Sequence, residues 1–86
     1  MQSDRFAQAM VGFCYSNGLG VSRNPKKAAQ WFLAAARRGD ACSMYNLALM
    51  LEVGDGIPKN SRRAVKWYLQ AAKKGDVEAQ TNLALM

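Results

Sequence analysis

The sequence contains no histidine and only two cysteines, Cys14 and Cys42, among its 86 residues. The absence of histidine removes the general base of the common Ser-His and Cys-His nucleophile arrangements, and it excludes metal sites built on imidazole. Two separated cysteines cannot complete a zinc site and are too few for a disulfide framework. The sequence therefore predicts a protein that is not an enzyme, has no catalytic residues and uses neither a metal nor a cofactor.

Long apolar stretches are also missing. Polar side chains at Asp4, Arg5, Gln8 and Ser16 interrupt the first 20 residues, so no run of signal-peptide length is present there. No other stretch approaches the roughly 18 apolar residues that span a membrane. We therefore expect no membrane-bound segment in the chain as given. Because both cysteines are expected to be reduced thiols, the sequence favours a cytoplasmic location.

The chain instead repeats itself. Half of its residues are hydrophobic, which is enough for one small folded domain. Residues 4–39 align with residues 40–75 without a gap, and residues 40–50 (DACSMYNLALM) match residues 76–86 (DVEAQTNLALM) at six of eleven positions. The sequence thus predicts one structural domain with a first repeat at 4–39, a second at 40–75 and the opening of a truncated third at 76–86. The first alignment contains ten identical pairs: Asp4/Asp40, Gly18/Gly54, Gly20/Gly56, Asn24/Asn60, Ala28/Ala64, Trp31/Trp67, Leu33/Leu69, Ala35/Ala71, Ala36/Ala72 and Gly39/Gly75.

The second half of each repeat has the pattern of an amphipathic helix. In the first repeat, apolar residues recur with the spacing of one helix face, at Ala28, Trp31, Phe32, Ala35 and Ala36. Asn24 is suited to cap the start of this helix, Pro25 to occupy its first turn and Gly39 to end it. The second repeat carries the same residue types at the same places. We expect Trp31, Trp67 and the alanines to serve packing alone.

The first half of each repeat predicts another helix, which begins at an aspartate suited to capping: Asp4, Asp40 and Asp76. The inner face of the helix at 4–17 is expected to contain Ala7, Val11 and Tyr15. Gly12 and Ala48 are small where the partner helix must come close. One helix pair cannot bury its own apolar face, so successive pairs are expected to stack. The predicted fold class is all-α, a right-handed α-α superhelix of about two and a third helix-turn-helix repeats of 36 residues.

The glycine and aromatic spacing of these repeats resembles that of the Sel1-like repeat, a relative of the tetratricopeptide repeat. The resemblance covers nearly the whole chain and departs from the family pattern mildly, for example at Asn24 and Asn60, where aspartate is usual. It implies a solenoid whose first helices line the concave side. The first copy carries the resemblance at Ala7, Val11, Gly12, Tyr15, Gly18, Gly20, Val21, Lys27, Ala28, Trp31, Phe32, Ala35, Ala36, Gly39 and Asp40, and the second at Leu47, Gly54, Gly56, Ile57, Arg63, Ala64, Trp67, Tyr68, Ala71, Ala72, Gly75 and Asp76.

Some members of this family are rich in cysteine, and an enzymatic role against β-lactams has been attributed to them. In that version, a cysteine near the end of the second helix pairs with one at the start of the next first helix. Cys42 holds the latter position here, but Ala34, Ala35 and Ala36 leave it without such a partner. The resemblance therefore implies an interaction scaffold for this chain, not an enzyme.

The residues expected on the concave side include large apolar side chains, although another face of each helix already supplies the core. These concave positions are Phe6, Ala9, Phe13, Ser16, Asn17, Cys42, Tyr45, Leu49, Glu52, Val53, Glu78, Thr81 and Leu85. An apolar surface of this kind suits a peptide groove, but it equally suits contact with neighbouring repeats or a second copy. Asn46 and Asn82 lie near this side, where an amide could bond a peptide or bridge the two helices of its own repeat. We predict that a peptide or partner protein binds at Phe6, Phe13, Asn17, Tyr45, Asn46, Leu49, Glu52, Asn82 and Leu85.

The charges predict a basic side and a neutral-to-acidic side. The chain has 12 basic and 6 acidic residues, a net charge of +6. Nine basic residues lie on the second helices, whereas the acids lie on first helices or turns. The alternative function is therefore a basic-surface module for nucleic acid. Such modules usually expose aromatic rings as well, and with Trp31 and Trp67 expected inside, a solvent-facing basic side is favoured. The nine are Lys26, Lys27, Arg37, Arg38, Arg62, Arg63, Lys66, Lys73 and Lys74.

The truncated third repeat predicts an open apolar end. Leu83, Leu85 and Met86 would lack the helix that covers their counterparts in a full repeat. Solenoids usually end in polar capping repeats. We therefore expect either a longer array or self-association through this end, and the sequence does not identify the partner.

Overall fold

The computed structural model of the chain describes residues 2–75 and Gln80, with side chains from Arg5 onwards. These residues form helices joined by loops, with no strand among them. The predicted all-α fold of helix-turn-helix repeats is therefore confirmed. The four helices are α1 (Gln2–Asn17), α2 (Pro25–Arg37), α3 (Ala41–Val53) and α4 (Ser61–Lys73).

Asparagine caps fix the start of both second helices, as the sequence predicts. The side-chain oxygen of Asn24 accepts a hydrogen bond from the backbone N–H of Lys27 at 3.1 Å. Asn60 accepts from the backbone N–H of Arg63 at the same distance. Each bond satisfies one of the amide donors that the first turn of a helix leaves without an internal partner.

The two first helices begin differently. Asp40 caps α3 as predicted, because its Oδ2 accepts from the backbone N–H of Ser43 at 2.9 Å. The corresponding prediction for Asp4 is wrong, since α1 begins at Gln2 and Asp4 lies inside the helix. No glycine or proline stands before Asp4 to stop the helix from extending by another half turn. The predicted cap at Asp76 lies outside the described residues.

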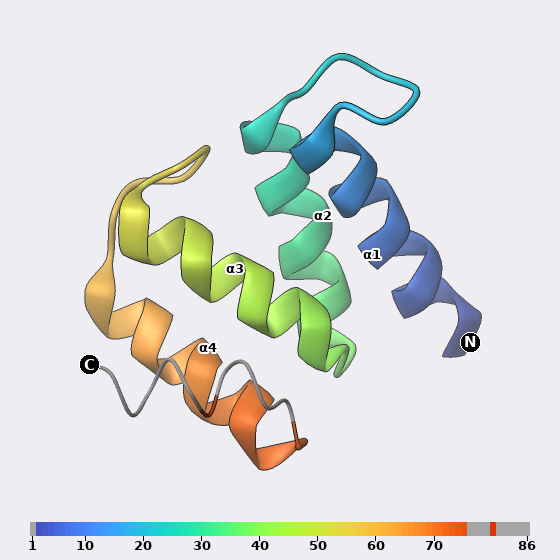
Figure 1. Cartoon of the computed structure of the whole chain (residues 1–86). Coiled ribbons are helices and arrows are strands. Elements are labelled where there is room, and N and C mark those ends of the chain that lie inside the picture. The colour runs from blue at the N-terminus through green and yellow to red at the C-terminus, as the bar shows by residue number, and fades with distance from the viewer. Residues whose placement is uncertain (1, 76–79, 81–86) are drawn as a thin grey trace.

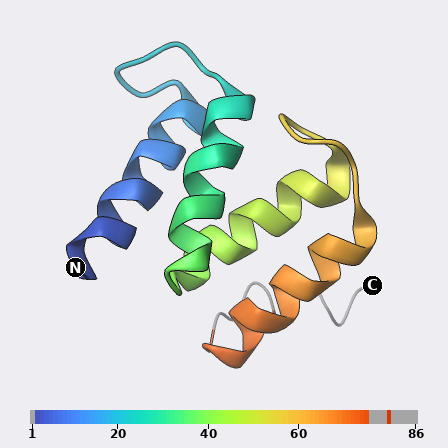
Figure 2. The same cartoon turned by 180° about the vertical axis from the view of Figure 1, so that it is seen from behind.

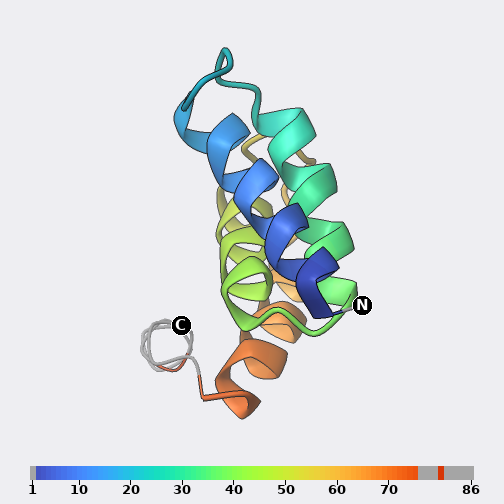
Figure 3. The ribbon, with the colours of Figure 1, turned by 90° about the vertical axis from the view of Figure 1, so that its right-hand side faces the viewer.

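The helices form two layers. Seen edge-on, α1 and α3 lie on one side and α2 and α4 on the other (Figure 3). The first helices run in the same general direction, and the second helices return in the opposite one (Figure 1). The loops at 18–24 and 54–60 lie at the same end of the molecule, as the view from behind also shows (Figure 2). α2 packs against both α1 and α3, so the two repeats stack through it.

The hydrophobic core lies between the layers and joins both repeats. Its small positions act as predicted: a Cβ at Gly12 would lie 2.9 Å from Cδ1 of Phe32, closer than real Cβ contacts allow. Ala48 and Tyr68 take these two places in the second repeat, and both are fully buried. The core consists of Ala28, Ala29, Phe32, Ala36, Met44, Leu47, Ala48, Met50, Leu51, Ala64, Tyr68 and Ala71.

A second contact between the repeats is made by their loops. The turn of the second repeat packs so closely on α2 that a Cβ at Gly56 would collide with the backbone carbonyl of Pro25. Arg23 reaches across beside this contact, where its Nη2 donates to Oδ2 of Asp55 at 2.9 Å. Its Nε also donates to the carbonyl oxygen of Ser16 at 3.0 Å. The loops thereby hold the repeats together at one end.

Two packing predictions for the first repeat are wrong. Trp31 is 37% exposed, and Ala7 is exposed as well. Their counterparts in the second repeat are more buried, since Trp67 packs against the core cluster, as predicted, and Ser43 is fully buried. The difference follows from stacking, because the second repeat has the first as a neighbour and no described repeat precedes the first.

None of the helices in the described part of the chain combines the length and apolar character that crossing a membrane requires. The predicted first helix of a third repeat, at 76–86, falls outside the residues that the structure describes, apart from Gln80.

Candidate functional site

An apolar groove runs between the two first helices. It consists of two adjoining hollows of about 540 and 290 Å³, which share Phe32 and Asn46. α1 forms one wall, α3 forms the other, and Phe32 contributes from α2 between them. We call this feature the inner groove. Its lining residues are Phe6, Ala9, Met10, Phe13, Cys14, Ser16, Leu19, Phe32, Asp40, Cys42, Ser43, Asn46, Leu49, Met50, Val53 and Asp55.

The α1 wall exposes large apolar side chains. Phe6, Met10 and Phe13 are 55%, 68% and 53% exposed. They follow one another at i, i+4 and i+7, so they lie on one face of α1. Single exposed apolar residues are common on protein surfaces, but a contiguous set that lines a hollow is typical of a binding site.

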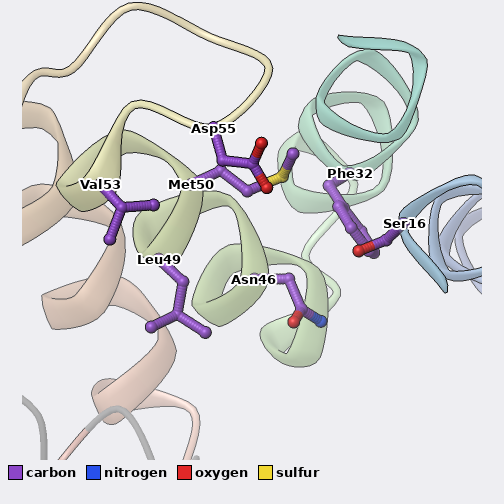
Figure 4. Close-up of a pocket in the computed structure, with 7 residues that line it drawn as sticks. All are labelled: Ser16, Phe32, Asn46, Leu49, Met50, Val53 and Asp55. Atoms are coloured by element: carbon purple, nitrogen blue, oxygen red, sulfur yellow. The ribbon is translucent and has the colours of Figure 1, made fainter. Parts of the chain in front are cut away.

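The smaller hollow lies at the other end of the inner groove. Figure 4 shows the Met50 side chain reaching from α3 towards Phe32, with Ser16 of α1 beside the ring. Leu49 and Asn46 project from another side of α3. Asp55 borders this hollow from the loop that follows α3. The groove is thus apolar along its length, with polar groups at separate points.

The structure places four of the predicted site residues in the inner groove. Phe6 and Phe13 line the larger hollow, Leu49 lines the smaller one and Asn46 borders both. The amide of Asn46 does not bridge two helices, because its Nδ2 donates to the carbonyl oxygen of Cys42 in the same helix at 2.9 Å. Its Oδ1 remains as a polar acceptor site at the border between the hollows.

The other predicted site residues lie elsewhere. Asn17 is exposed and donates to the carbonyl oxygen of Phe13 in its own helix at 3.0 Å. Tyr45 packs on the core, with its ring centroid 5.9 Å from that of Tyr68. Glu52 is half-buried and lines neither hollow. Asn82 and Leu85 lie outside the described residues.

Several lining residues escaped the sequence analysis. Met10 was detectable, because it follows Phe6 by one helical turn on the same face. Phe32 has the sequence pattern of a core residue. Its ring belongs to the core and also lines the inner groove. Leu19 and Asp55 belong to loops, and helical periodicity does not predict where a loop lies relative to the helices.

Both cysteines of the chain border the larger hollow, Cys14 from α1 and Cys42 from α3. Cys42 is exposed and Cys14 is partly buried, and no disulfide joins them. Because the sequence contains no other cysteine, a thiol reagent reports on this groove alone. Within the described part of the chain, no three Cys, Asp or Glu side chains gather in a way that would hold a metal ion.

The opposite side of the molecule is basic, as predicted, and all nine basic residues of the second helices are exposed. It also contains a shallow hollow of about 440 Å³ at the edge of the first repeat. This edge hollow is lined by Tyr15, Lys27, Gln30, Trp31 and Ala34. The Nζ of Lys27 lies 5.5 Å from the centroid of the Tyr15 ring. Aromatic and basic side chains therefore meet on this surface, contrary to the expectation that Trp31 is inside.

Stacked helix pairs with an apolar groove between their first helices define a helical-repeat protein of the α-solenoid class. The comparisons with known proteins make the assignment more specific. The family model of the Sel1 repeat matches residues 5–40 and 43–76. The chain belongs to the Sel1 repeat family.

Solved structures support this assignment. A Sel1 repeat protein from Oxalobacter formigenes is 43% identical, with a TM-score of 0.90 over 94% of this chain and 33% of its own length. A protective antigen of uropathogenic Escherichia coli, described as displaying an SLR fold, is 33% identical, with a TM-score of 0.91 over 95% of this chain and 18% of its own. The cysteine-rich protein B of Helicobacter pylori is 28% identical, with a TM-score of 0.85 over 90% of this chain and 58% of its own.

The chain therefore spans between 18% and 58% of the length of these proteins. No curated protein matches the chain significantly.

Proposed function

We propose that this chain is a non-enzymatic interaction scaffold that holds a peptide segment of a partner protein in the inner groove. The observation that supports this most strongly is the row of Phe6, Met10 and Phe13, each more than half exposed along a hollow of about 540 Å³. Burying such side chains against a partner removes apolar surface from water, at about 25 cal/mol per Å².

The fold lowers the cost of binding. The α3 wall has its other face in the shared core, and the α1 wall packs along α2, with Tyr15 against the core cluster. The anchors are therefore held in place before a ligand arrives, and the ligand is the main component that must become ordered. The family assignment agrees with this role, because Sel1 repeats generally mediate protein interactions.

The two groove cysteines provide a direct test. A helical peptide selected from a displayed library is expected to slow the alkylation of Cys42 by iodoacetamide. At about ten times the Kd of the peptide, the reaction should be about tenfold slower, because only the unbound fraction reacts. Peptides that bind tightly but leave the alkylation rates of both thiols unchanged would place binding outside the groove.

Matched variants locate the contact. Phe13→Ser is expected to raise the Kd of the peptide by about tenfold or more, because the substitution removes a central anchor. Leu69→Ser is the control, since Leu69 is 46% exposed on α4 and lines neither hollow of the groove. If the thiols instead become protected as the protein concentration rises without peptide, a second copy occupies the groove. Light scattering would then show the dimer, and self-association would replace partner binding.

The groove also bears on the compartment. An exposed thiol such as Cys42 is open to oxidation and modification outside a reducing environment. A group attached there would enter the larger hollow. We therefore propose a reducing compartment, such as the cytoplasm, for the working protein.

A second candidate function rests on the edge hollow. Trp31 and Tyr15 line it beside Lys27, whose Nζ lies over the Tyr15 ring. Single-stranded nucleic acid binds surfaces of this composition, with bases stacked on aromatic rings and phosphates near basic side chains. The edge hollow lies at one edge of the molecule and lacks a row of apolar side chains that are each more than half exposed, so this candidate ranks below the groove.

The second candidate predicts a steep salt dependence. Affinity for a labelled oligouridylate is expected to fall linearly in a plot of log affinity against log salt, with a slope of about −0.7 for each phosphate neutralised. Trp31→Ala should weaken binding by about fivefold or more, because a base loses its stacking partner. Phe6→Ala, in the inner groove, should leave this affinity unchanged. Equal losses in the two variants would remove the edge hollow as a nucleic-acid site.

A further inference from the structure

The charges of the inner groove oppose the charge of the whole chain. The protein carries 12 basic and 6 acidic residues. The groove lining, in contrast, contains two aspartates, Asp40 and Asp55, and neither lysine nor arginine. Asn46 adds a side-chain oxygen at the border of the hollows, while one of the two N–H donors of its Nδ2 is used within α3. The polar side chains along the groove therefore present mainly acceptors to a ligand.

The two aspartates lie at opposite ends of one wall. Asp40 is the N-cap of α3, and Asp55 follows the last residue of that helix by two positions. The 13 residues of α3 extend about 20 Å at 1.5 Å per residue. Between the carboxylates the wall is formed mainly by apolar side chains, including Leu49, Met50 and Val53. Along α3, the groove therefore has a carboxylate at each end and a mainly apolar surface between them.

Both carboxylates have capacity for a ligand. Asp40 accepts two bonds from Ser43, from its backbone N–H at 2.9 Å and from its hydroxyl at 2.5 Å, and both go to Oδ2. An ionised carboxylate has about four acceptor positions, so these bonds leave room for a cation. Asp55 pairs with Arg23, but this pair is exposed. Exposed ion pairs contribute little to stability, so a ligand cation can share or replace Arg23 at little cost.

Besides Arg23, a second basic group lies beside the α1 wall without lining the groove. Arg5 lies with its Cζ 5.2 Å from the centroid of the Phe6 ring. Its Nη1 is directed to the carbonyl oxygen of Arg38, at 3.4 Å, and the residue is not part of the groove lining.

Among the basic residues of the second helices, Lys74 comes near Asp40, because its Nζ lies 3.4 Å from the position that a Cβ on the adjacent Gly39 would take. None of these basic residues lines the inner groove.

We propose that the segment bound in the inner groove is an amphipathic helix with an apolar stripe about as long as α3 and a lysine or arginine near each end. This proposal rests on the proposed function and specifies the chemistry of the partner. Net charge alone would favour the opposite ligand, an acidic peptide. The charges of the groove therefore favour a basic-ended peptide, whereas the net charge of the chain favours an acidic one, and a binding measurement can distinguish the two.

The test uses two peptides of about 18 residues, long enough for an apolar stripe of about 20 Å and charged ends. They share the same leucine and alanine stripe and differ only at the ends, where one has lysines and the other glutamates. Fluorescence anisotropy at physiological salt is expected to give a Kd at least about tenfold lower for the lysine peptide. Cys42 alkylation, measured in parallel, shows whether each peptide lies in the groove.

Variants of the full chain assign the preference to the two aspartates. Asp40→Asn with Asp55→Asn is expected to reduce the lysine preference to about threefold or less. The unfolding midpoint should change little, because asparagine caps helices as well as aspartate does and the Asp55–Arg23 pair is exposed. Gln30→Lys with Gln70→Lys is the matched control. It raises the net charge by the same amount at two exposed positions outside the groove lining, and the preference should persist.

The outcomes separate the two proposals. If both peptides protect Cys42 with equal affinity, or the glutamate peptide binds tighter, the basic-ended partner is wrong and the groove function stands. If the control pair abolishes the preference as fully as the aspartate pair does, net charge is the cause and the inference fails. If neither peptide binds nor protects Cys42, and a library yields no groove ligand either, both proposals fail.

Discussion

Replacing Tyr68 by alanine is expected to lower the free energy of unfolding by about 3–5 kcal/mol. Tyr68 has the largest side chain among the fully buried residues in the described part of the chain. Its ring lies against Tyr45 in the core that both repeats share. Removing the ring exposes apolar surface and leaves a cavity that the surrounding helices cannot fully close. Because small domains have about 5–15 kcal/mol of stability in total, the loss is a large part of it.

Urea unfolding followed by circular dichroism measures this effect. Leu69→Ala is the matched control, since Leu69 neighbours Tyr68 on the same helix but is 46% exposed. The control should cost less than about 1 kcal/mol, as surface substitutions usually do. A similar loss in both variants would contradict the expectation that burial of the Tyr68 ring in the shared core sets the cost.

Replacing Gly56 by alanine is expected to cost about 2–5 kcal/mol, for two separable reasons. Gly56 has a φ of +76°, a backbone conformation in which a side chain costs about 1–2 kcal/mol. A Cβ there would also collide with the backbone of Pro25, at the contact between the two repeats. Overpacking of this kind usually costs about 1–3 kcal/mol more.

A substitution at Gly20 separates the cost of the backbone conformation from the cost of the collision. It occupies the same position of the first repeat with the same φ of +76°, but a Cβ there would meet nothing within 4 Å. Gly20→Ala should therefore show the conformational cost alone, and the difference between the variants measures the contact between the repeats. Equal losses in urea unfolding would show that the second turn yields easily and that the loop contact adds little to stacking.

The repeat itself was readable from the sequence because its signals are local. Helix caps at Asn24, Asn60 and Asp40 depend on side chains that bond amides three residues away. The spacing of apolar residues then fixes which face of each helix turns inward. The same reasoning failed at Asp4, where the capping residue type was present but the helix continued past it.

The groove was only partly readable. Phe6, Phe13 and Leu49 were predicted because helical spacing separates them from the core face. Tyr45 was predicted beside them, yet its ring reaches Tyr68 instead, since a long side chain near the edge of a face can turn either way. Phe32 could not be assigned to the groove, because whether a buried core ring also borders a hollow depends on how far apart α1 and α3 lie.

Exposure at the edge of the first repeat was likewise decided by the tertiary structure. Trp31 and Trp67 have the same place in identical patterns, and one is a surface residue while the other packs on the core. No periodicity distinguishes them, because the difference is made by the neighbouring repeat.

The sequence by itself determined the four described helices, the caps at Asn24, Asp40 and Asn60 and the order in which the helices stack, because each depends on residues within a few positions of one another and on a period of 36. The tertiary structure alone decided that Asp40 and Asp55 border one groove, that both cysteines enter it and that Trp31 faces outward. The reason is physical: these features depend on distances between elements, which are set by how side chains fill the space between stacked helices and leave no local pattern in the chain.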